Sequence, residues 1–392
     1  MNAGTFLLFS ACIENGLREG ARPDAESAPE VLLAPPEASI DVVRMPHGMP
    51  DSDALLYEEG VIHDIYLTLD DGARSDLEHE PRVDVHAGFR WGQDTRVYEV
   101  GLRLKGTASF RPLSLKSAFK VDFHEWDPEG RFHGVKRLTL NNMVQDATMM
   151  HEHLYYWLCQ KLGIPAPRHG YARVWVNEVD YGLHGIVETF DEQLIDRLWP
   201  YDDKGTLYEA SGDLTQQGRD GFEVKESGLG PALDDLITTI DATPPDGFLA
   251  MLEANFDLEA LLGYLALDIV GGNPDGYAQN HHNYYLYSAP LTWKWTLLPA
   301  GTDRSFSLLD RGLAGRLAIG CAEDDRCRAL LDERIRKTAD AWDELGVEAV
   351  AREMLEVVGP ACEADPRRER LCRSPEILDF IVGRTDAVRK GL

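Results

Sequence analysis

Residues 265–287 read LALDIVGGNPDGYAQNHHNYYLY and connect an apolar helical pattern to an aromatic strand pattern. The loop between the two patterns holds Asp275, with Asn280 and Asn283 a few residues further on. A loop Asp followed by an Asn suits phosphoryl transfer. The carboxylate can orient an attacking hydroxyl and accept its proton, while the amide oxygen helps to hold Mg²⁺. Asn, Pro, Asp and Gly also form ordinary turns, so a structural turn is the alternative.

A second acidic loop follows a predicted hairpin. Residues 283–287 and 293–298 alternate like two paired strands, and the sequence LPAGTDRSF at 298–306 places Asp303 just past the second strand. A carboxylate in that place can bind the metal that bridges the phosphates of a nucleotide. The alternative is an exposed loop carboxylate, which is the commoner fate of a lone Asp.

The part of the chain before these loops is rich in predicted strands. From about residue 55 to residue 123, apolar and polar residues alternate between turn signals, which is typical of half-buried antiparallel strands. The segment LKGTASFRPLSLKSAFK at 104–120 combines a Gly- and Ser-containing loop with lysines, which could offer N–H groups and positive charge to phosphates. Exposed strand lysines are usually only solvated, so this segment alone is a weak signal.

Helical spacing dominates the later part of the chain. The elements predicted after residue 123 are a helix at 146–162, strands at 172–177 and 182–188, and helices at 232–241, 246–255, 257–270 and in the tail 328–392. An early strand Lys, a helix Glu, an Asp…Asn loop, a hairpin and a second Asp follow one another in the order found in protein kinases. The predicted fold class is α+β and two-lobed, with a β-rich N-lobe at 39–190 and a mostly helical C-lobe at 191–392.

The charge of the chain limits its partners. The 392 residues include 67 acidic and 39 basic residues, which gives a formal net charge of -28. Such a surface repels phosphate backbones and argues against nucleic-acid binding. It also repels ATP, so a nucleotide site would need local Lys or Arg side chains or a metal ion.

Four of the six cysteines form two close pairs, Cys321 with Cys327 and Cys362 with Cys372. Each pair encloses a short polar loop, which favours local disulfides in an oxidising compartment. Cross-pairing and a zinc site are the alternatives. The spacings are not those of CxxC motifs and no His lies beside either pair, so zinc is the weaker alternative.

The first residues, MNAGTFLLFSAC at 1–12, end in a small-residue-then-Cys pattern like a bacterial lipoprotein cleavage site. We expect lipidation of Cys12, a flexible linker at 13–38 and an exported protein anchored in the bacterial cell envelope. The apolar stretch is short and no basic residue precedes it, which an upstream start codon would explain. An ordinary cytoplasmic N-terminus with a chance Cys is the alternative.

Over roughly residues 55 to 310 the chain resembles the CotH-type kinases, a family named for a spore coat protein and found in bacterial envelope proteins. The matching stretches are LRLKGTASFRPLSLKSAFKVDF, LTLNNMVQDATMMHEHL, LGIPAPRHGYARVWVNEVDYGLHGIVETFD, LALDIVGGNPDGYAQNHHNYYLY and WTLLPAGTDRSF. The resemblance implies an atypical protein-kinase fold that binds ATP with Mg²⁺ or Mn²⁺ and phosphorylates Ser or Thr hydroxyls of a protein substrate.

The same resemblance suggests roles for single residues. Asp275 resembles the catalytic Asp and Asp303 the metal-binding Asp. Asn283 looks like the metal-binding Asn, and Asn280 is the alternative because it has the spacing of an ordinary kinase loop. The residues expected to contact or border ATP are Lys116 or Lys120, Glu152 as the partner of that lysine, Glu188 near the adenine pocket, and Arg111.

The sequence also departs from kinase patterns. It lacks the GxGxxG, VAIK, HRD and DFG strings of ordinary kinases. Residues 299–302 read PAGT where many relatives carry a Trp before the metal Asp, which puts the pocket shape in doubt. A surface binding or adhesion protein on the same fold, with little or no catalysis, is the alternative function, since ATP is expected to be scarce outside the cell.

Overall fold

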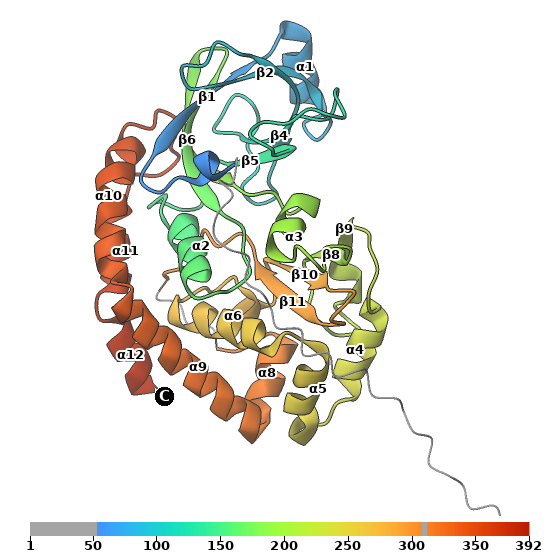
Figure 1. The fold of residues 1–392 in the computed structure, drawn as a ribbon. Coiled ribbons are helices and arrows are strands. Elements are labelled where there is room, and N and C mark those ends of the chain that lie inside the picture. Colours follow the sequence, from blue (N-terminus) through green and yellow to red (C-terminus); the bar gives the residue numbers. More distant parts are fainter. Residues whose placement is uncertain (1–52, 308–311, 392) are drawn as a thin grey trace, which may run out of the picture. The chain divides into compact units, whose positions relative to one another are not determined.

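The computed structural model of the chain describes residues 53–307 and 312–391 (Figure 1). These residues belong to one compact unit, and it combines strands and helices as predicted for an α+β fold. The cleavage-site-like segment with Cys12 and the linker at 13–38 lie outside the described residues. Their assignments, and the boundary predicted between 190 and 191, stay predictions.

The N-terminal part is a closed β-barrel with the strand order β1-β2-β3-β4-β5-β7-β6. Neighbouring strands pair antiparallel, except that β1 and β6 are parallel and close the barrel. The elements of this part are β1 (Ile62–Thr68), α1 (Asp71–His79), β2 (Val85–Trp91), β3 (Tyr98–Lys105), β4 (Ala118–Asp122), β5 (Arg137–Asn141), α2 (His151–Lys161), β6 (His169–Val176) and β7 (Val179–Val187).

Alternation along β3 separates the barrel core from a polar outer face. Leu102 and Leu104 are buried and belong to the same apolar cluster as Phe89 and Phe119. Because successive strand side chains point to opposite faces, Arg103 and Lys105 extend away from this core. The barrel thereby presents cations at the end of β3, where the chain leaves for the loop 106–117.

The C-terminal part combines helices with a small antiparallel sheet of order β11-β10-β8-β9. Helix α10 contacts β7 of the barrel (Figure 1). The elements are α3 (Glu192–Leu198), β8 (Thr206–Ala210), β9 (Phe222–Glu226), α4 (Leu233–Ala242), α5 (Phe248–Asn255), α6 (Leu258–Val270), α7 (Tyr277–Asn280), β10 (Tyr284–Ser288), β11 (Trp295–Pro299), α8 (Arg316–Glu323), α9 (Asp325–Glu344), α10 (Val347–Glu363), α11 (Ile377–Ile381) and α12 (Arg384–Gly391). Short 3-10 helices lie at Ala54–Tyr57, Arg219–Gly221, Pro245–Gly247 and Ser374–Glu376.

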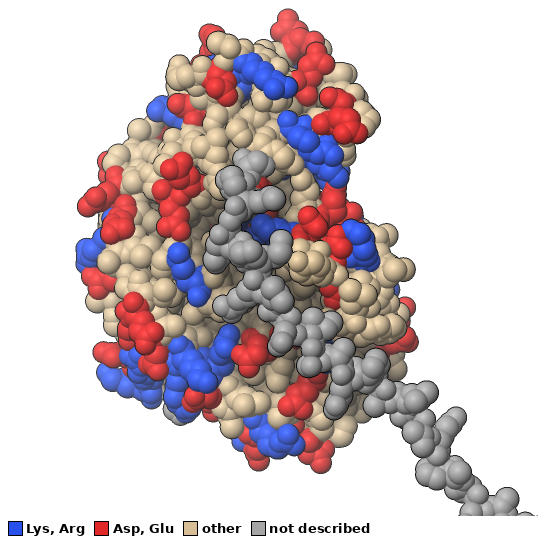
Figure 2. Space-filling model, in the orientation of Figure 1, with Lys and Arg blue, Asp and Glu red and all other residues tan. Residues whose placement is uncertain are grey.

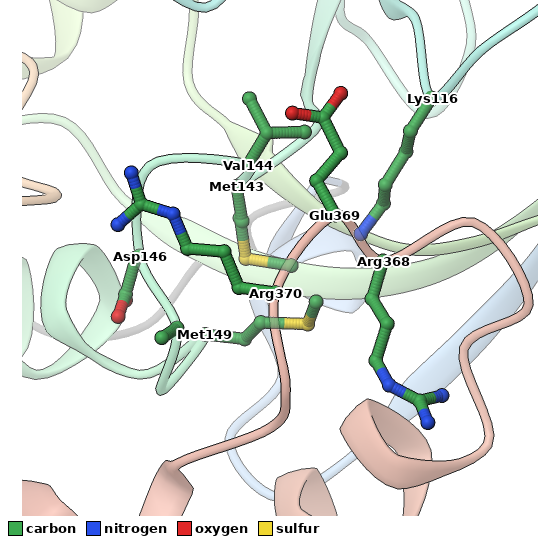
Figure 3. Close-up of a pocket in the computed structure, with 9 residues that line it drawn as sticks. Lys116, Met143, Val144, Asp146, Met149, Arg368, Glu369 and Arg370 are labelled. Carbon is green, nitrogen blue, oxygen red and sulfur yellow. The ribbon is translucent and has the colours of Figure 1, made fainter.

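Helix α2 begins later than the helix predicted at 146–162. Met143 and Met149 have positive φ angles of 53° and 57°, so the chain before His151 turns instead of coiling. The buried Asp146 carboxylate accepts hydrogen bonds from the backbone N–H groups of Thr148 and His151, at 2.8 and 2.9 Å. These turns also line a small pocket beside Arg368, Glu369 and Arg370 of the C-terminal part (Figure 3).

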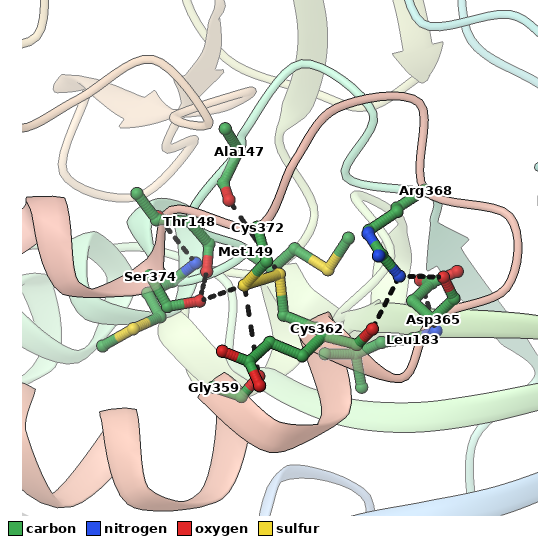
Figure 4. Close-up of a disulfide and its surroundings, with 12 residues drawn as sticks. Ala147, Thr148, Met149, Leu183, Gly359, Cys362, Asp365, Arg368, Cys372 and Ser374 are labelled. Carbon is green, nitrogen blue, oxygen red and sulfur yellow. Dashed lines mark hydrogen bonds between the residues drawn. A yellow bond between two sulfur atoms is a disulfide. The ribbon is translucent and has the colours of Figure 1, made fainter.

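The cysteines pair locally, as their spacing predicts. Cys321 is bonded to Cys327, and Cys362 to Cys372. The second disulfide closes a loop after α10 whose Asp365 and Arg368 lie beside it in Figure 4. In the part of the chain that the structure describes, no helix is long and apolar enough to cross a membrane.

Candidate active site

The loop that carries Asp275 is folded around a buried carboxylate of α6. Asp268 accepts hydrogen bonds from Tyr155 Oη at 2.6 Å, from Asn273 Nδ2 at 2.9 Å and from the Ala278 backbone N–H at 3.0 Å. Burial raises the pKa of Asp268 to about 6. A Cβ at Gly276 would lie 2.4 Å from Asp268 Oδ1, so only glycine fits there. Sequence reasoning missed Asp268, although a carboxylate within an apolar helix was its signal.

Asp275 has two side-chain partners at the surface of this loop. Its Oδ1 accepts a hydrogen bond from Asn280 Nδ2 at 3.3 Å, and its Oδ2 accepts one from Arg304 Nη1 at 2.8 Å. The structure therefore brings the predicted catalytic Asp together with one of the two predicted metal-binding Asn residues. It also adds Arg304, which follows the predicted metal-binding Asp.

Asp303 lies in the turn after β11, close to several other acids. The His151 ring nitrogen Nδ1 lies 3.2 Å from the Asp303 carbonyl oxygen and ties this turn to α2. Burial raises the pKa of Asp303 to about 8, and the carboxylates of Glu152, Asp146 and Asp275 act in the same direction. The two acidic loops predicted from the sequence therefore face a common region, together with the start of α2.

Lys105, at the end of β3, is a second cation near these acids. Lys105 Nζ donates to Asn141 Oδ1 at 2.8 Å, and Asn141 Nδ2 donates to Glu152 Oε2 at 2.7 Å. Burial lowers the pKa of Lys105, and the carboxylates of Glu152 and Asp303 oppose that shift. The lysine linked to Glu152 is thus Lys105, through an intervening amide, and not Lys116 or Lys120, which the sequence argument selected.

Lys120 lies on the same barrel face as Lys105. It pairs with Arg103 across β3 and β4, while Lys105 pairs with Ala118, so the three cationic side chains share one side of the sheet. Burial lowers the pKa of Lys120 to about 8, and the nearby Lys105 and Arg103 add to the effect. Lys120 therefore lies at the edge of the site.

Three other predicted residues are engaged away from these acids. Lys116 forms a buried ion pair with Asp365 at 2.6 Å. Arg111 pairs with Glu369. Glu188 accepts hydrogen bonds from the guanidinium groups of Arg168 and Arg197. Contact of these three side chains with ATP stays a prediction, and their partners in the structure do not favour it.

The donor groups of the site suit a hard divalent cation. Asp303 and Asp275 offer carboxylate oxygens, and Asn280 and Asn283 offer amide oxygens, which are ligands that Mg²⁺ prefers. Asn283 is exposed, and its Nδ2 lies 3.4 Å from the Gly301 carbonyl oxygen in the loop that leads to Asp303. Over residues 53–307 and 312–391, no three His, Cys, Asp or Glu side chains are placed to hold a metal by themselves. Mg²⁺ commonly takes its remaining ligands from phosphates and water, so the site fits such an ion.

A buried pair of histidines, His153 and His169, lies next to Glu152, and the pH dependence of stability tests whether they are buried in the neutral form. His153 Nδ1 lies 3.0 Å from His169 Nδ1, and burial lowers the pKa of His153 to about 4. Because the unfolded chain binds this proton more tightly, His153 lowers the free energy of unfolding as pH falls below its unfolded pKa of about 6.5. The penalty reaches roughly 2 kcal/mol at pH 5.

We therefore expect the free energy of unfolding of His153→Gln, relative to that of wild type, to rise by roughly 2 kcal/mol when the pH is lowered from 7 to 5. Urea unfolding at the two pH values measures this difference. Asp268 has the opposite effect, because its raised pKa makes the fold more stable as the pH falls. This effect is present in both proteins, so it cancels when they are compared at the same pH. His79→Gln, at an exposed position, is the control. An unchanged difference between His153→Gln and wild type at the two pH values would contradict the burial of a neutral His153.

Two comparisons with known proteins find similarity over this part of the chain. A family described as CotH kinase protein matches residues 102–368, a range that includes Lys105, Glu152, Asp275 and Asp303. The inner spore coat protein H of Bacillus subtilis (strain 168) is 23% identical over 205 residues, which cover 49% of this chain and 55% of that protein. The match thus spans about half the length of the curated relative.

Proposed function

The chain belongs to the CotH kinase family, and on this premise we propose that it transfers the γ-phosphate of ATP to Ser or Thr hydroxyls of a protein in a metal-dependent reaction. The observation that carries the proposal is the convergence of Lys105, Glu152, Asp275 and Asp303. These residues come from β3, α2 and two separate loops. Hydrogen bonds join them: Lys105 reaches Glu152 through Asn141, the ring of His151 contacts the Asp303 carbonyl oxygen, and Arg304, next to Asp303, donates to Asp275.

Each residue has a distinct role in this proposal. Asp275 orients the acceptor hydroxyl and accepts its proton. Lys105 holds phosphate oxygens, while Asn141 and Glu152 fix the direction of its ammonium group. Asp303 would hold Mg²⁺ or Mn²⁺ together with Asn280 or Asn283. When bound, such an ion supplies positive charge that offsets the charge of the phosphates.

Lys120 and Arg103 extend the same cationic face and could attract the phosphates of ATP. This local positive charge would offset the repulsion of ATP by a chain with a net charge of -28. Acidic and basic side chains are interspersed over the face shown in Figure 2, so attraction of ATP has to be local.

We also propose that the protein is exported or coat-associated. Its relative is named a spore coat protein, and the two local disulfides suit an oxidising compartment. The lipid anchor at Cys12 remains part of this proposal.

Transfer of labelled γ-phosphate from ATP, with Mg²⁺ and then Mn²⁺, to the protein itself and to a generic protein acceptor tests the proposed reaction. We expect Asp275→Asn to lower transfer by at least about a hundredfold while ATP still binds, because the substitution removes the proton acceptor. We expect Asp303→Ala to abolish metal-dependent nucleotide binding. Asp246→Asn, at an exposed position away from these acids, is the control.

Label that appears with wild type and Asp246→Asn but not with the other two variants would support the kinase assignment and its site. An absence of label from wild type, under conditions where ATP binds, would contradict it. That outcome would favour a binding or adhesion protein on the same fold.

A further inference from the structure

Arg304 is placed between the two acids to which the proposed reaction assigns roles. It directly follows Asp303, and its Nη1 donates to Asp275 Oδ2 at 2.8 Å. The turn that carries it is fixed, because Ser305 donates to the Thr302 carbonyl oxygen through its backbone N–H at 3.1 Å and through its hydroxyl at 2.7 Å. The guanidinium group therefore lies beside the carboxylate to which the proposed reaction assigns the acceptor hydroxyl.

Among residues 53–307 and 312–391, Asp275 is the only side chain that Arg304 contacts by hydrogen bond or ion pair. A guanidinium group has five N–H donors, and the contact with Asp275 uses one of its nitrogens. The Arg304 side chain is 41% exposed, whereas that of Asp275 is 16% exposed. An Arg that served only to neutralise Asp275 would need no more than an ion pair shielded from solvent. Here the planar group is partly exposed, and its fork of donors suits bidentate contact with phosphate oxygens.

The charges around the site indicate what Arg304 could stabilise. Arg304 follows Asp303 in the chain and pairs with Asp275, and Lys105 lies on the barrel side, bound to Asn141. In the transition state of phosphoryl transfer, charge is spread over the three equatorial oxygens of the transferred group. A cation on the side of Asp275, opposite the barrel, would stabilise that charge at the point where the acceptor attacks.

We propose that Arg304 is a further catalytic residue that binds the phosphoryl group during its transfer, and this inference rests on the proposed kinase function. In the step, the acceptor oxygen forms a bond to the γ-phosphorus and the bond from that phosphorus to the β,γ-bridging oxygen breaks. The electron pair of the broken bond stays on ADP, and the hydroxyl proton passes to the Asp275 carboxylate. Arg304 donates hydrogen bonds to the transferred group and releases part of its contact with Asp275.

Kinetics of Arg304→Gln test the role in transfer. We expect kcat to fall by about a hundredfold to a thousandfold, because a donor to the transition state is lost. The KM for ATP should change by less than roughly tenfold, since the interaction is made mainly in the transition state. Arg304→Lys, which keeps the charge without the planar fork, should recover part of the loss. Arg219→Gln is the matched control, because Arg219 is 36% exposed and also pairs with a single carboxylate, that of Asp234.

A binding measurement separates this role from one of merely holding Asp275. With Mg²⁺, ADP plus aluminium fluoride imitates the transferred phosphoryl group, and Arg304→Gln should weaken its binding about a hundredfold while binding of ADP alone changes by roughly twofold or less. Thermal unfolding of each variant confirms that the fold is kept.

Three results would overturn the inference. Equal kcat in wild type and Arg304→Gln would exclude a catalytic role. A higher kcat in Arg304→Gln would show that Arg304 restrains Asp275 in the resting protein. Equal binding of ADP plus aluminium fluoride by the two proteins would show that Arg304 does not touch the transferred group. If the wild type itself transfers no label, the proposed function fails together with the inference.

Discussion

Lys105→Met is expected to lower kcat/KM for phosphoryl transfer on the order of a thousandfold while the chain stays folded. Lys105 is half-buried at the end of β3 and lies beside Asn141, with Glu152 and Asp303 acting on it electrostatically. Methionine keeps the length and packing of the side chain but removes the charge that would hold phosphate oxygens. The fold should tolerate the change, because Glu152 keeps its hydrogen bond from Asn141 when the ammonium group is lost.

Labelled phosphate transfer, nucleotide binding and thermal unfolding measure this effect together. Lys161→Met is the control, because it removes a half-exposed lysine of the neighbouring helix α2 and lies outside the site. Lys120→Met should have a smaller effect than Lys105→Met, since Lys120 lies at the edge of the site. Normal transfer by Lys105→Met would contradict the choice of lysine and return Lys120 and Lys116 to consideration.

The acids of the site could be predicted from the sequence because short patterns place them. Asp275 and Asp303 lie in loops next to a helix or a strand whose periodicity is clear, and Glu152 lies in a segment with helical spacing. Each residue can be found from the short stretch of sequence around it. In the structure these stretches come together in one region, as expected from the order of elements in protein kinases.

The lysine could not be predicted in the same way. Lys105, Lys116 and Lys120 occur close together in the sequence, and local pattern does not show which of them has a distant partner. Lys116 lies before β4 and pairs with a residue 249 positions later, whereas Lys105 is turned toward α2 by the alternation of β3. Strands β8 and β9 also escaped prediction. Strand β8 pairs with β10, which is distant in the sequence, and β9 pairs with β8.

A second large effect is expected at Lys116, on stability. Lys116 and Asp365 are both 0% exposed at their side chains and form an ion pair of 2.6 Å between the barrel part and the loop closed by Cys362 and Cys372. Removing one member of a buried pair leaves the other charge without its counter-ion. Lys116→Met should therefore lower the free energy of unfolding by about 3–5 kcal/mol.

The surroundings of Asp365 explain why its loop cannot simply move away. Asp365 also accepts hydrogen bonds from the backbone N–H groups of Leu183 at 2.9 Å and Arg367 at 2.8 Å. A Cβ at Gly182 would lie 2.0 Å from Asp365 Oδ1, so the close approach of this loop to β7 depends on glycine. The carboxylate stays in place when Lys116 is lost, and the penalty of a buried charge remains.

A double-mutant cycle measured by urea unfolding separates the lost charge from the lost packing. Asp365→Asn removes the charge and keeps one oxygen, which can accept from one of the two N–H groups that bond to separate carboxylate oxygens in the wild type. The double variant should therefore be more stable than Lys116→Met, even though it carries an additional substitution. Lys161→Met, on an exposed part of α2, should change stability by less than about 0.5 kcal/mol. If Lys116→Met behaved like Lys161→Met, the Lys116–Asp365 pair would not join the two parts of the fold, and Lys116 would again be a candidate for contact with ATP.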